Sequence, residues 1–396
     1  MIINNEHKKL NVPNLRFPEF QGEWEKTKFG DIATGFDYGM NAAAKNYDGV
    51  NKYIRITDID EASSTYKDKD IVSPDGVLAD NYLVNNRDIL LARTGASTGK
   101  SYLYKKSDGK LYYAGFLIRA NVTTHAPYFV FSQLHTHRYW RWVSIMSARS
   151  GQPGINSQEY SSFPIYTTSI EEESKIAKLL SLLDERIATQ NKIIEDLKKL
   201  KSAIIEIEYT PNTKTTSHIG NVIEQISKRN KNNAIQNVLS VSNRQGFIKQ
   251  SDQFENRNVA SEDTSNYKIV EKNDFAFNPA RINVGSIARL TTFENGIVSP
   301  MYICFRTQEN VAPEYIDFFF ESKHFYCEIQ KRLEGSVRQC LSFEGLCNIP
   351  FSLPSLEMQQ RIGKRLFTLG QKIKTETDLL ELLNKQKQYL LRQMFI

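Results

Sequence analysis

The chain has 396 residues, of which 40% are hydrophobic and 24% are charged, and its formal net charge is +6. A chain of this length is expected to hold two or three domains, and no apolar run approaches the ~20 residues that a membrane span needs. The modest positive charge permits a polyanionic partner but does not require one.

Residues 1–23 are mostly polar and are expected to form an N-terminal tail, without the apolar segment of a signal peptide. The end of this tail, Arg16–Trp24, brings aromatic side chains that should pack against a folded domain. The first domain is expected over 24–165 and contains many short strand candidates. These candidates are Tyr53–Ile56, Asp88–Ala92, Ser101–Tyr104 and Leu111–Ala114. Pro127–Trp142 has helical spacing.

A long helical spacer is expected over 166–209. Its apolar positions step by four, three and four residues, which is the spacing of a coiled-coil seam. The seam residues are Ile176, Leu180, Leu183 and Ile187. Gln190 occupies the next seam position, where it either forms a polar layer with its counterpart in a partner helix or bends out to solvent. Ser169 and Glu172 have the spacing of a capping box at the helix start.

The same stretch occurs again 186 positions later, with thirteen identities over 163–209 and no gap. The identical residues of the first copy are Pro164, Ser169, Glu171, Ile176, Lys178, Leu180, Leu183, Ile187, Thr189, Glu195, Leu197, Lys199 and Lys201. The corresponding seam of the second copy consists of Ile362, Leu366, Leu369 and Ile373, with Glu376 at the position of Gln190. The chain is therefore a tandem duplication, and its two seams are predicted to pair as an antiparallel coiled coil.

The second domain is expected over 210–351 and the second helical spacer over 352–396. Val238–Val241 matches Tyr53–Ile56, and Asp274–Phe277 matches Asp88–Leu91. Outside such positions the two domains share little sequence. The predicted fold class is α+β, with two mixed, strand-rich domains, each followed by a long helix, in a pseudo-twofold duplication.

All four cysteines lie in the second half of the chain and have no close paired spacing. They are Cys304, Cys327, Cys340 and Cys347. We expect reduced thiols and a cytoplasmic protein.

Motifs that could indicate an enzyme are incomplete. Gly95–Ser101 resembles a phosphate-binding loop but is one residue short, and a strand is expected after it instead of a helix. Asn278–Arg281 lacks part of the amino-methyltransferase signature that it resembles. His135 and His137 have no nearby Cys or acidic residue to complete a metal site. We therefore expect no catalytic residue, no metal and no cofactor in this chain.

Polar loop residues remain as the candidates for binding. Arg, Lys, Asn and Gln can hydrogen-bond to base edges in the major groove or to phosphates, although any one such residue taken alone is more often an ordinary solvated loop residue. The DNA-binding candidates are Arg93, Thr94, Lys100, Gln152, Asn243, Arg244, Lys249, Arg281, Asn283 and Arg338.

Two globular regions, each followed by a copy of one long helix, resemble the specificity (S) subunit of type I restriction–modification enzymes. The resemblance also includes Leu15–Trp24, Phe163–Tyr166 and Pro350–Ile362. It implies two target recognition domains that each read half of a split, asymmetric DNA sequence. It also implies that the paired helices dock two methylation (M) subunits and that restriction (R) subunits join the complex. S-adenosylmethionine, ATP and Mg²⁺ would then be used on the partner subunits.

Two alternatives from other classes remain open at this point. A coiled-coil scaffold joining two protein-binding domains would have the same helices but no salt-dependent affinity for duplex DNA. A stand-alone DNA methyltransferase or nuclease would need the motifs that the sequence lacks.

Overall fold

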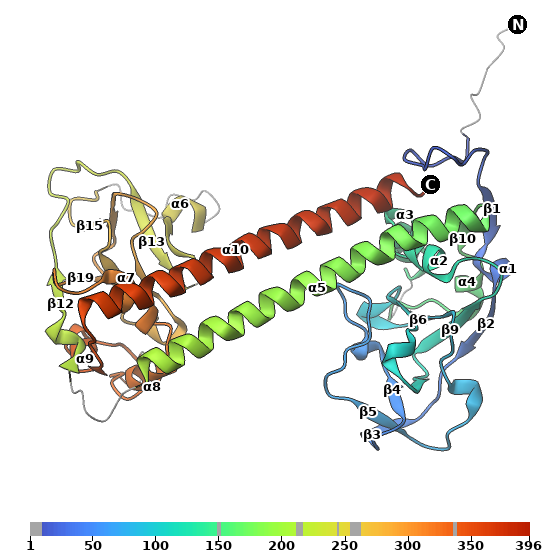
Figure 1. Cartoon of the computed structure of the whole chain (residues 1–396), viewed down its shortest axis with the longest axis horizontal. Helices are drawn as coiled ribbons and strands as arrows, with labels where there is room; N and C mark the ends of the chain where they lie inside the picture. Colours follow the sequence, from blue (N-terminus) through green and yellow to red (C-terminus); the bar gives the residue numbers. More distant parts are fainter. Residues whose placement is uncertain (1–9, 149–151, 211–216, 244, 254–262, 336–338) are drawn as a thin grey trace, which may run out of the picture. The chain divides into compact units, whose positions relative to one another are not determined.

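The structure is a computed structural model that describes residues 10–148, 152–210, 217–243, 245–253, 263–335 and 339–396. These residues form two compact units. Unit 1 contains the described residues up to Lys192 together with Asp378–Ile396, and unit 2 is Ile193–Thr377. Both units combine short strands with helices (Figure 1), so the predicted α+β fold class is confirmed.

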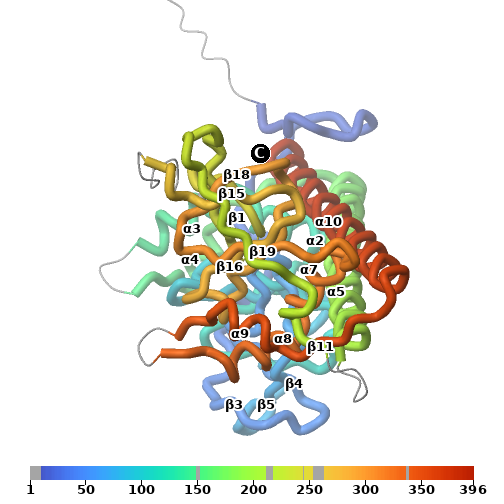
Figure 2. The backbone as a smooth tube through the Cα atoms, turned by 90° about the vertical axis from the view of Figure 1, so that its left-hand side faces the viewer, coloured from blue at the N-terminus to red at the C-terminus, as the bar shows by residue number. Residues whose placement is uncertain are grey.

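Unit 1 is built around a four-stranded antiparallel sheet in the order β2-β9-β6-β7. Its strand β6 is buried along its whole length. Two-stranded pairings surround this sheet: β1 with β10, β3 with β5, and β4 with β8. The ribbon of β3 and β5 lies at the end of unit 1 remote from the long helices (Figures 1 and 2).

The strands and short helices of unit 1 have the following bounds: β1 Glu25–Lys28, α1 Phe29–Ile32, β2 Ala33–Tyr38, β3 Ala43–Asn46, β4 Lys52–Ile54, β5 Val72–Asp75, β6 Asp88–Ala92, β7 Ser101–Leu103, β8 Leu111–Tyr113, β9 Leu117–Val122, α2 Pro127–Gln133, α3 His137–Met146, α4 Ser157–Ser161 and β10 Pro164–Thr167.

The stretch predicted as helical over Pro127–Trp142 is divided between α2 and α3. The division has a local cause, because the Thr136 side chain accepts a hydrogen bond from the amide of Tyr139 and so caps a new helix. The hydroxyl of Ser132 meanwhile donates to the carbonyl of Tyr128 in the last turns of α2.

Two long helices run through both units: α5, Ile170–Tyr209, and α10, Leu356–Gln393. The first part of α5 shares a hydrophobic core with the last part of α10 in unit 1. In unit 2 the last part of α5 shares a core with the first part of α10. The two helices therefore run in opposite directions. No helix in the described part of the chain is long and apolar enough to cross a membrane.

The seam residues lie on the covered sides of these helices to different extents. Five of them are buried: Ile176, Leu180, Leu183, Ile362 and Leu366. The other three apolar members, Ile187, Leu369 and Ile373, are partly buried. Gln190 is buried, whereas Glu376 is half-buried and forms an ion pair with Lys372 one turn away.

The N-terminal segment packs on unit 1 through both an aromatic and an ionic contact. Trp24 is fully buried, and Arg16 forms a bidentate ion pair with Glu172, with both N–O distances 2.7 Å. The predicted capping box is only half formed: Ser169 accepts from the amide of Glu172, but the Glu172 carboxylate binds Arg16 and Thr168 instead. The sequence spacing could not reveal that a distant arginine would compete for this carboxylate.

Unit 2 repeats the four-stranded antiparallel sheet in the order β12-β19-β16-β17. A second four-stranded sheet, β14-β13-β18-β15, packs beside it around a separate hydrophobic cluster. Strands β15, β16, β18 and β19 of this unit are labelled in Figure 2.

Its elements have the following bounds: β11 Ser217–His218, β12 Ile223–Ile226, β13 Val238–Ser242, β14 Gly246–Lys249, α6 Gln250–Gln253, β15 Lys268–Glu271, β16 Phe275–Phe277, β17 Ile287–Arg289, β18 Asn295–Val298, β19 Ile303–Thr307, α7 Pro313–Phe319, α8 Lys323–Gln330, α9 Phe343–Cys347 and β20 Pro350–Phe351.

Equivalent turns close both central sheets in the same way. The amide of Ala92 donates to the carbonyl of Lys100 over 2.8 Å, and 186 positions later the amide of Asn278 donates to that of Ser286 over 3.0 Å. Each turn contains a glycine with positive φ, Gly99 at 92° and Gly285 at 89°. Because other residues are strained in this conformation, glycine is required at both places.

Candidate nucleic-acid interface

One end of each central sheet collects most of the candidate binding residues. In unit 1, β2 and β6 end where β9 and β7 begin, as the pairings Tyr38↔Ile118, Ala92↔Leu117 and Leu91↔Ser101 require. In unit 2 the same end is where β12 and β16 end and β19 and β17 begin. We call this end of each sheet its loop edge.

Three candidates of unit 1 come together at its loop edge. Arg93 and Thr94 follow β6 directly, and Thr94 forms an isolated β-bridge with Gly154. The exposed side chain of Gln152 reaches the same turn, since its Nε2 lies 3.4 Å from the place that a Cβ on Gly95 would occupy. Residues 58 and 59 positions apart in the sequence thus form one polar surface.

Lys100 closes the same loop but is directed to a carboxylate. Its Nζ lies 3.4 Å from Glu61, and its side chain is only 19% exposed. The glutamate is largely exposed, so this ion pair is weak and can be exchanged for a phosphate contact. The Gly95–Ser101 stretch contains a short 3-10 turn and is followed by strand β7, as predicted, instead of the helix that a phosphate-binding loop requires.

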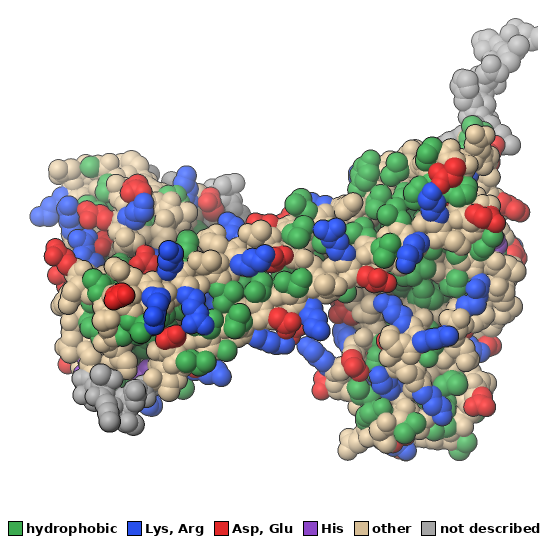
Figure 3. Space-filling model, in the orientation of Figure 1, with side chains coloured by type: hydrophobic (Ala, Val, Ile, Leu, Met, Phe, Trp, Pro, Cys, Tyr) green, Lys and Arg blue, Asp and Glu red, His purple; other side chains and the backbone are tan. Residues whose placement is uncertain are grey.

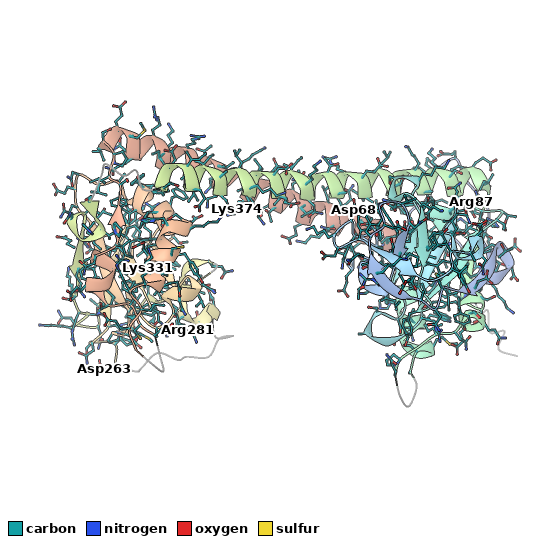
Figure 4. The ribbon with its side chains drawn as sticks, turned by 90° about the horizontal axis from the view of Figure 1, so that it is seen from below. Asp68, Arg87, Asp263, Arg281, Lys331 and Lys374 are labelled. Atoms are coloured by element: carbon teal, nitrogen blue, oxygen red, sulfur yellow. The ribbon has the colours of Figure 1, made fainter. Side chains whose placement is uncertain are left out.

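Unit 2 also gathers three candidates at its loop edge. Arg281 is exposed in the turn after β16, and Figure 4 places it at the surface of the unit. Asn283 follows in the same turn. The Cβ of Asn243 lies 3.8 Å from the place that a Cβ on Gly285 would occupy, which brings the turn between β13 and β14 to this loop.

The remaining candidates are not assembled with these residues. Lys249 is exposed at the far end of β14 from Asn243, about 10 Å along the strand. Arg244 and Arg338 lie outside the described residues.

The loop edges also expose apolar side chains that the sequence reasoning missed. In unit 1, Tyr38 is 42% and Phe116 is 62% exposed. In unit 2, Val284 and Met301 are 58% and 57% exposed. Hydrophobic residues next to strands are normally assigned to the core, so only their place in a turn at a strand end could have indicated a surface role. Exposed aromatic and apolar groups beside arginine suit contact with bases.

Side chains of opposite charge are interspersed on one face of the molecule. On the face shown in Figure 3, Lys and Arg side chains are mixed with Asp and Glu side chains. On this face, affinity for a polyanion would therefore have to come from the local placement of side chains and not from a field of one sign.

Two residues that could have indicated an enzyme, His135 and Asn278, have structural partners. His135 is bound to the carbonyl of Phe131 and the hydroxyl of Ser64, and burial lowers its pKa to about 4. Asn278 is buried, and its side-chain oxygen accepts from the amide of Ala280. Among the described residues, no group of three or more His, Cys, Asp or Glu side chains is placed to hold a metal ion.

The first turns of each long helix are attached by a buried side chain to the unit in which that helix begins. The helix α5 begins in unit 1 and α10 begins in unit 2. In unit 1, Glu173 accepts from the amide of Ala126 over 3.0 Å and lies 2.8 Å from Nδ1 of His125. Burial raises the pKa of this carboxyl group. In unit 2 the equivalent Gln359 accepts from the amide of Ala312 over 3.0 Å. The attachment is thus the same bond, made by a titratable residue in one unit and a neutral one in the other.

The chain matches the family model described as the type I restriction modification DNA specificity domain twice, over residues 21–199 and 204–385. It is 23% identical to the type I restriction enzyme MjaVIII specificity subunit of Methanocaldococcus jannaschii, over 98% of this chain and 94% of that protein.

Solved structures share the fold. The S subunit of a type I restriction–modification system from M. genitalium matches with a TM-score of 0.64 at 15% identity, covering 97% of this chain and 99% of that one. A chain from a study of complex assembly and conformational transition of the type I system matches with a TM-score of 0.52 at 14% identity, covering 94% and 97%.

Proposed function

The chain belongs to the type I restriction–modification DNA specificity family, and from this premise we propose that it recognises a bipartite, asymmetric DNA target. Unit 1 reads one half of the target at its loop edge, and unit 2 reads the other half at the equivalent place. The long helices α5 and α10 dock methylation subunits, and restriction subunits join the complex.

One observation carries this proposal. The two units share a sheet, its turns and its helix attachment, yet the side chains at their loop edges differ. Arg93, Thr94 and Gln152 stand at the edge of unit 1, whereas Arg281, Asn283 and Asn243 stand at that of unit 2. Two similar frameworks with different hydrogen-bonding side chains suit the reading of two different short sequences.

Proteins of this family generally carry no catalytic activity. We assign methyl transfer, ATP hydrolysis and DNA cleavage in this system to the partner subunits, which use S-adenosylmethionine, ATP and Mg²⁺. The role of this chain is then to position those subunits on one DNA sequence.

The test is a comparison of the purified chain with the chain plus methylation subunits. Methylated bases are mapped by sequencing DNA that has been incubated with S-adenosylmethionine and either preparation. The chain alone should leave DNA unmodified, and the complex should methylate one split sequence. Methyl transfer by the rigorously purified chain, or the lack of any salt-dependent affinity of the complex for duplex DNA, contradicts the proposal.

A further inference from the structure

Arg93 is held at the loop edge of unit 1 by an aromatic ring. Its guanidinium carbon lies 4.7 Å from the centre of the Tyr38 ring, which is the geometry of a cation–π contact. Its backbone is fixed on both sides, because its amide donates to Phe116 over 3.1 Å and its carbonyl accepts from Ile155 over 2.9 Å. Both the backbone of Arg93 and its guanidinium group are therefore held in place.

This contact leaves most of the hydrogen-bond donors of Arg93 available. A ring face attracts the charge of the guanidinium without accepting its N–H groups in the plane. Within the described part of the chain, the only acceptor for the Arg93 side chain is the carbonyl of Gly115, at 3.4 Å from Nη1. That distance is beyond an ordinary N–H···O hydrogen bond.

Three other arginines of unit 1 use their donors within the protein. Arg87 donates to three backbone carbonyls through Nε and Nη2. Arg119 binds Asp37 and two carbonyls. Arg138 also packs on aromatic rings, but it donates to the carbonyl of Pro164 and the side chain of Gln133. Arg93 is positioned like these residues, yet its Nε and Nη2 face no described acceptor.

Tyr38 is itself fixed at the end of β2. Its hydroxyl accepts from the amide of Ser157 at the start of α4, over 3.3 Å. The amide of the next residue, Gly39, donates to the carbonyl of Leu117. The ring is therefore tied to two elements that frame the loop edge, although 42% of the residue is exposed.

We propose that Tyr38 is a positioning residue that holds Arg93 as a preformed fork for one guanine of the DNA target. An arginine fork donates two parallel N–H bonds to O6 and N7 of guanine in the major groove, the commonest base-specific contact of this side chain. Stacking on Tyr38 fixes the plane of the fork before DNA arrives, so less side-chain entropy is lost on binding. This inference rests on the proposed function, since it assigns a base contact within the half-target of unit 1.

Four variants of the full chain, assembled with methylation subunits, test the assignment. They are Arg93→Ala, Tyr38→Leu, Tyr38→Phe and Tyr47→Leu. Tyr38→Phe keeps the ring and loses only the hydroxyl. Tyr47 is a matched control, because it is exposed to 38% and has no cation–π contact within the described residues. Base preference at each position is measured by selection from a randomised duplex library, and melting curves check that each variant is folded.

The wild type should prefer guanine at one position in one half of the target. Arg93→Ala and Tyr38→Leu should each reduce that preference roughly 10- to 100-fold and leave other positions unchanged. Tyr38→Phe and Tyr47→Leu should retain it. The salt dependence of Tyr38→Leu should equal that of the wild type, because no charge is removed.

Failure of this inference is distinguishable from failure of the proposed function. A wild-type complex without any sequence preference would overturn the proposed function. If preference is present but Tyr38→Leu changes no single position, or if Arg93→Ala weakens all sequences equally and flattens the salt slope by about one unit, the assignment of Arg93 to a guanine is wrong.

Discussion

In unit 1 the amide of Ile155 donates to the carbonyl of Arg93 over 2.9 Å, and in unit 2 the amide of Leu341 donates to the carbonyl of Pro279 over 3.0 Å. The two bonds are 186 positions apart and join the same parts of the fold. An arginine that carries five donors in one unit is a proline, with none in its side chain, in the other. The backbone of the loop edge is therefore kept while its chemistry changes.

The bonds at the start of each long helix and at the strand just before it, β10 or β20, show a smaller change of the same kind. Arg138 donates to the carbonyl of Pro164 over 2.8 Å, and its equivalent, His324, lies 2.9 Å from the carbonyl of Pro350. Glu173 and Gln359 likewise bind equivalent amides. Here the substituted residues can make the same bond. The comparison teaches that the bonds around the start of each long helix are kept although the residues differ, whereas at the loop edge only the backbone bond is kept.

The largest effect on stability is expected from Gln359→Glu, which gives unit 2 the carboxyl group that unit 1 has at the equivalent helix attachment. Gln359 is 1% exposed, and its Nε2 donates to the carbonyl of Pro354 over 2.9 Å. Gln359→Glu places a buried carboxylate against that carbonyl with no histidine beside it. At neutral pH it should lower the free energy of unfolding by about 3 kcal/mol, measured by urea denaturation. A loss below about 1 kcal/mol would mean that unit 2 accepts a carboxyl group at this position as unit 1 does, which would contradict the expected difference.

A smaller loss of stability is expected from a substitution at the bond between α3 and β10. Arg138→His copies the residue of unit 2 into unit 1 and can keep the bond to Pro164. It loses the contacts of the guanidinium with the rings of Phe163 and Tyr166, at 5.2 and 4.7 Å. We expect a loss of about 1–2 kcal/mol in the free energy of unfolding. Arg138→Ala is the control, and it should cost more because the carbonyl bond is also removed.

The reciprocal change, Glu173→Gln, should alter how stability depends on pH. Burial raises the pKa of Glu173 in the folded protein above its ordinary value of 4.5. Its contribution to stability is therefore fully present below the unfolded pKa and is lost as the pH rises through the folded pKa. The variant has no such loss, so its stability relative to the wild type should increase with pH above about 4. The check is urea denaturation of both proteins over a pH series. A relative stability that falls with rising pH would reverse the assigned sign.

The smallest effect on stability is expected at Lys100. Its partner Glu61 is 83% exposed, so Lys100→Ala should change the free energy of unfolding by less than about 1 kcal/mol. If Lys100 exchanges this partner for a phosphate, the variant should bind all duplexes more weakly, with a salt slope flatter by about one unit. Glu61→Gln is the matched control, because it frees the lysine and should strengthen binding. An unchanged salt slope in Lys100→Ala would remove Lys100 from the interface.

The sequence predicted the parts of this fold that rest on period and repetition. The seam from Ile176 to Ile187 and its copy specified two long helices, and Asp88–Ala92 specified a buried strand. Sequence reasoning failed where a distant partner decides the outcome. Arg16 takes the carboxylate of Glu172 from 156 positions away, and the cap at Thr136 interrupts a continuous helical pattern. Tyr38 was missed for the same reason, because its contact with Arg93 depends on strand order and not on local sequence.

The central claim is that each unit reads its own half of the DNA target. The most direct measurement is selection from a randomised duplex library by the complete complex carrying wild-type chain, Arg93→Ala or Arg281→Ala. The account predicts that Arg93→Ala relaxes the sequence preference in one half of the recovered target only, and that Arg281→Ala relaxes it in the other half only. Relaxation of both halves by either single substitution would contradict the account.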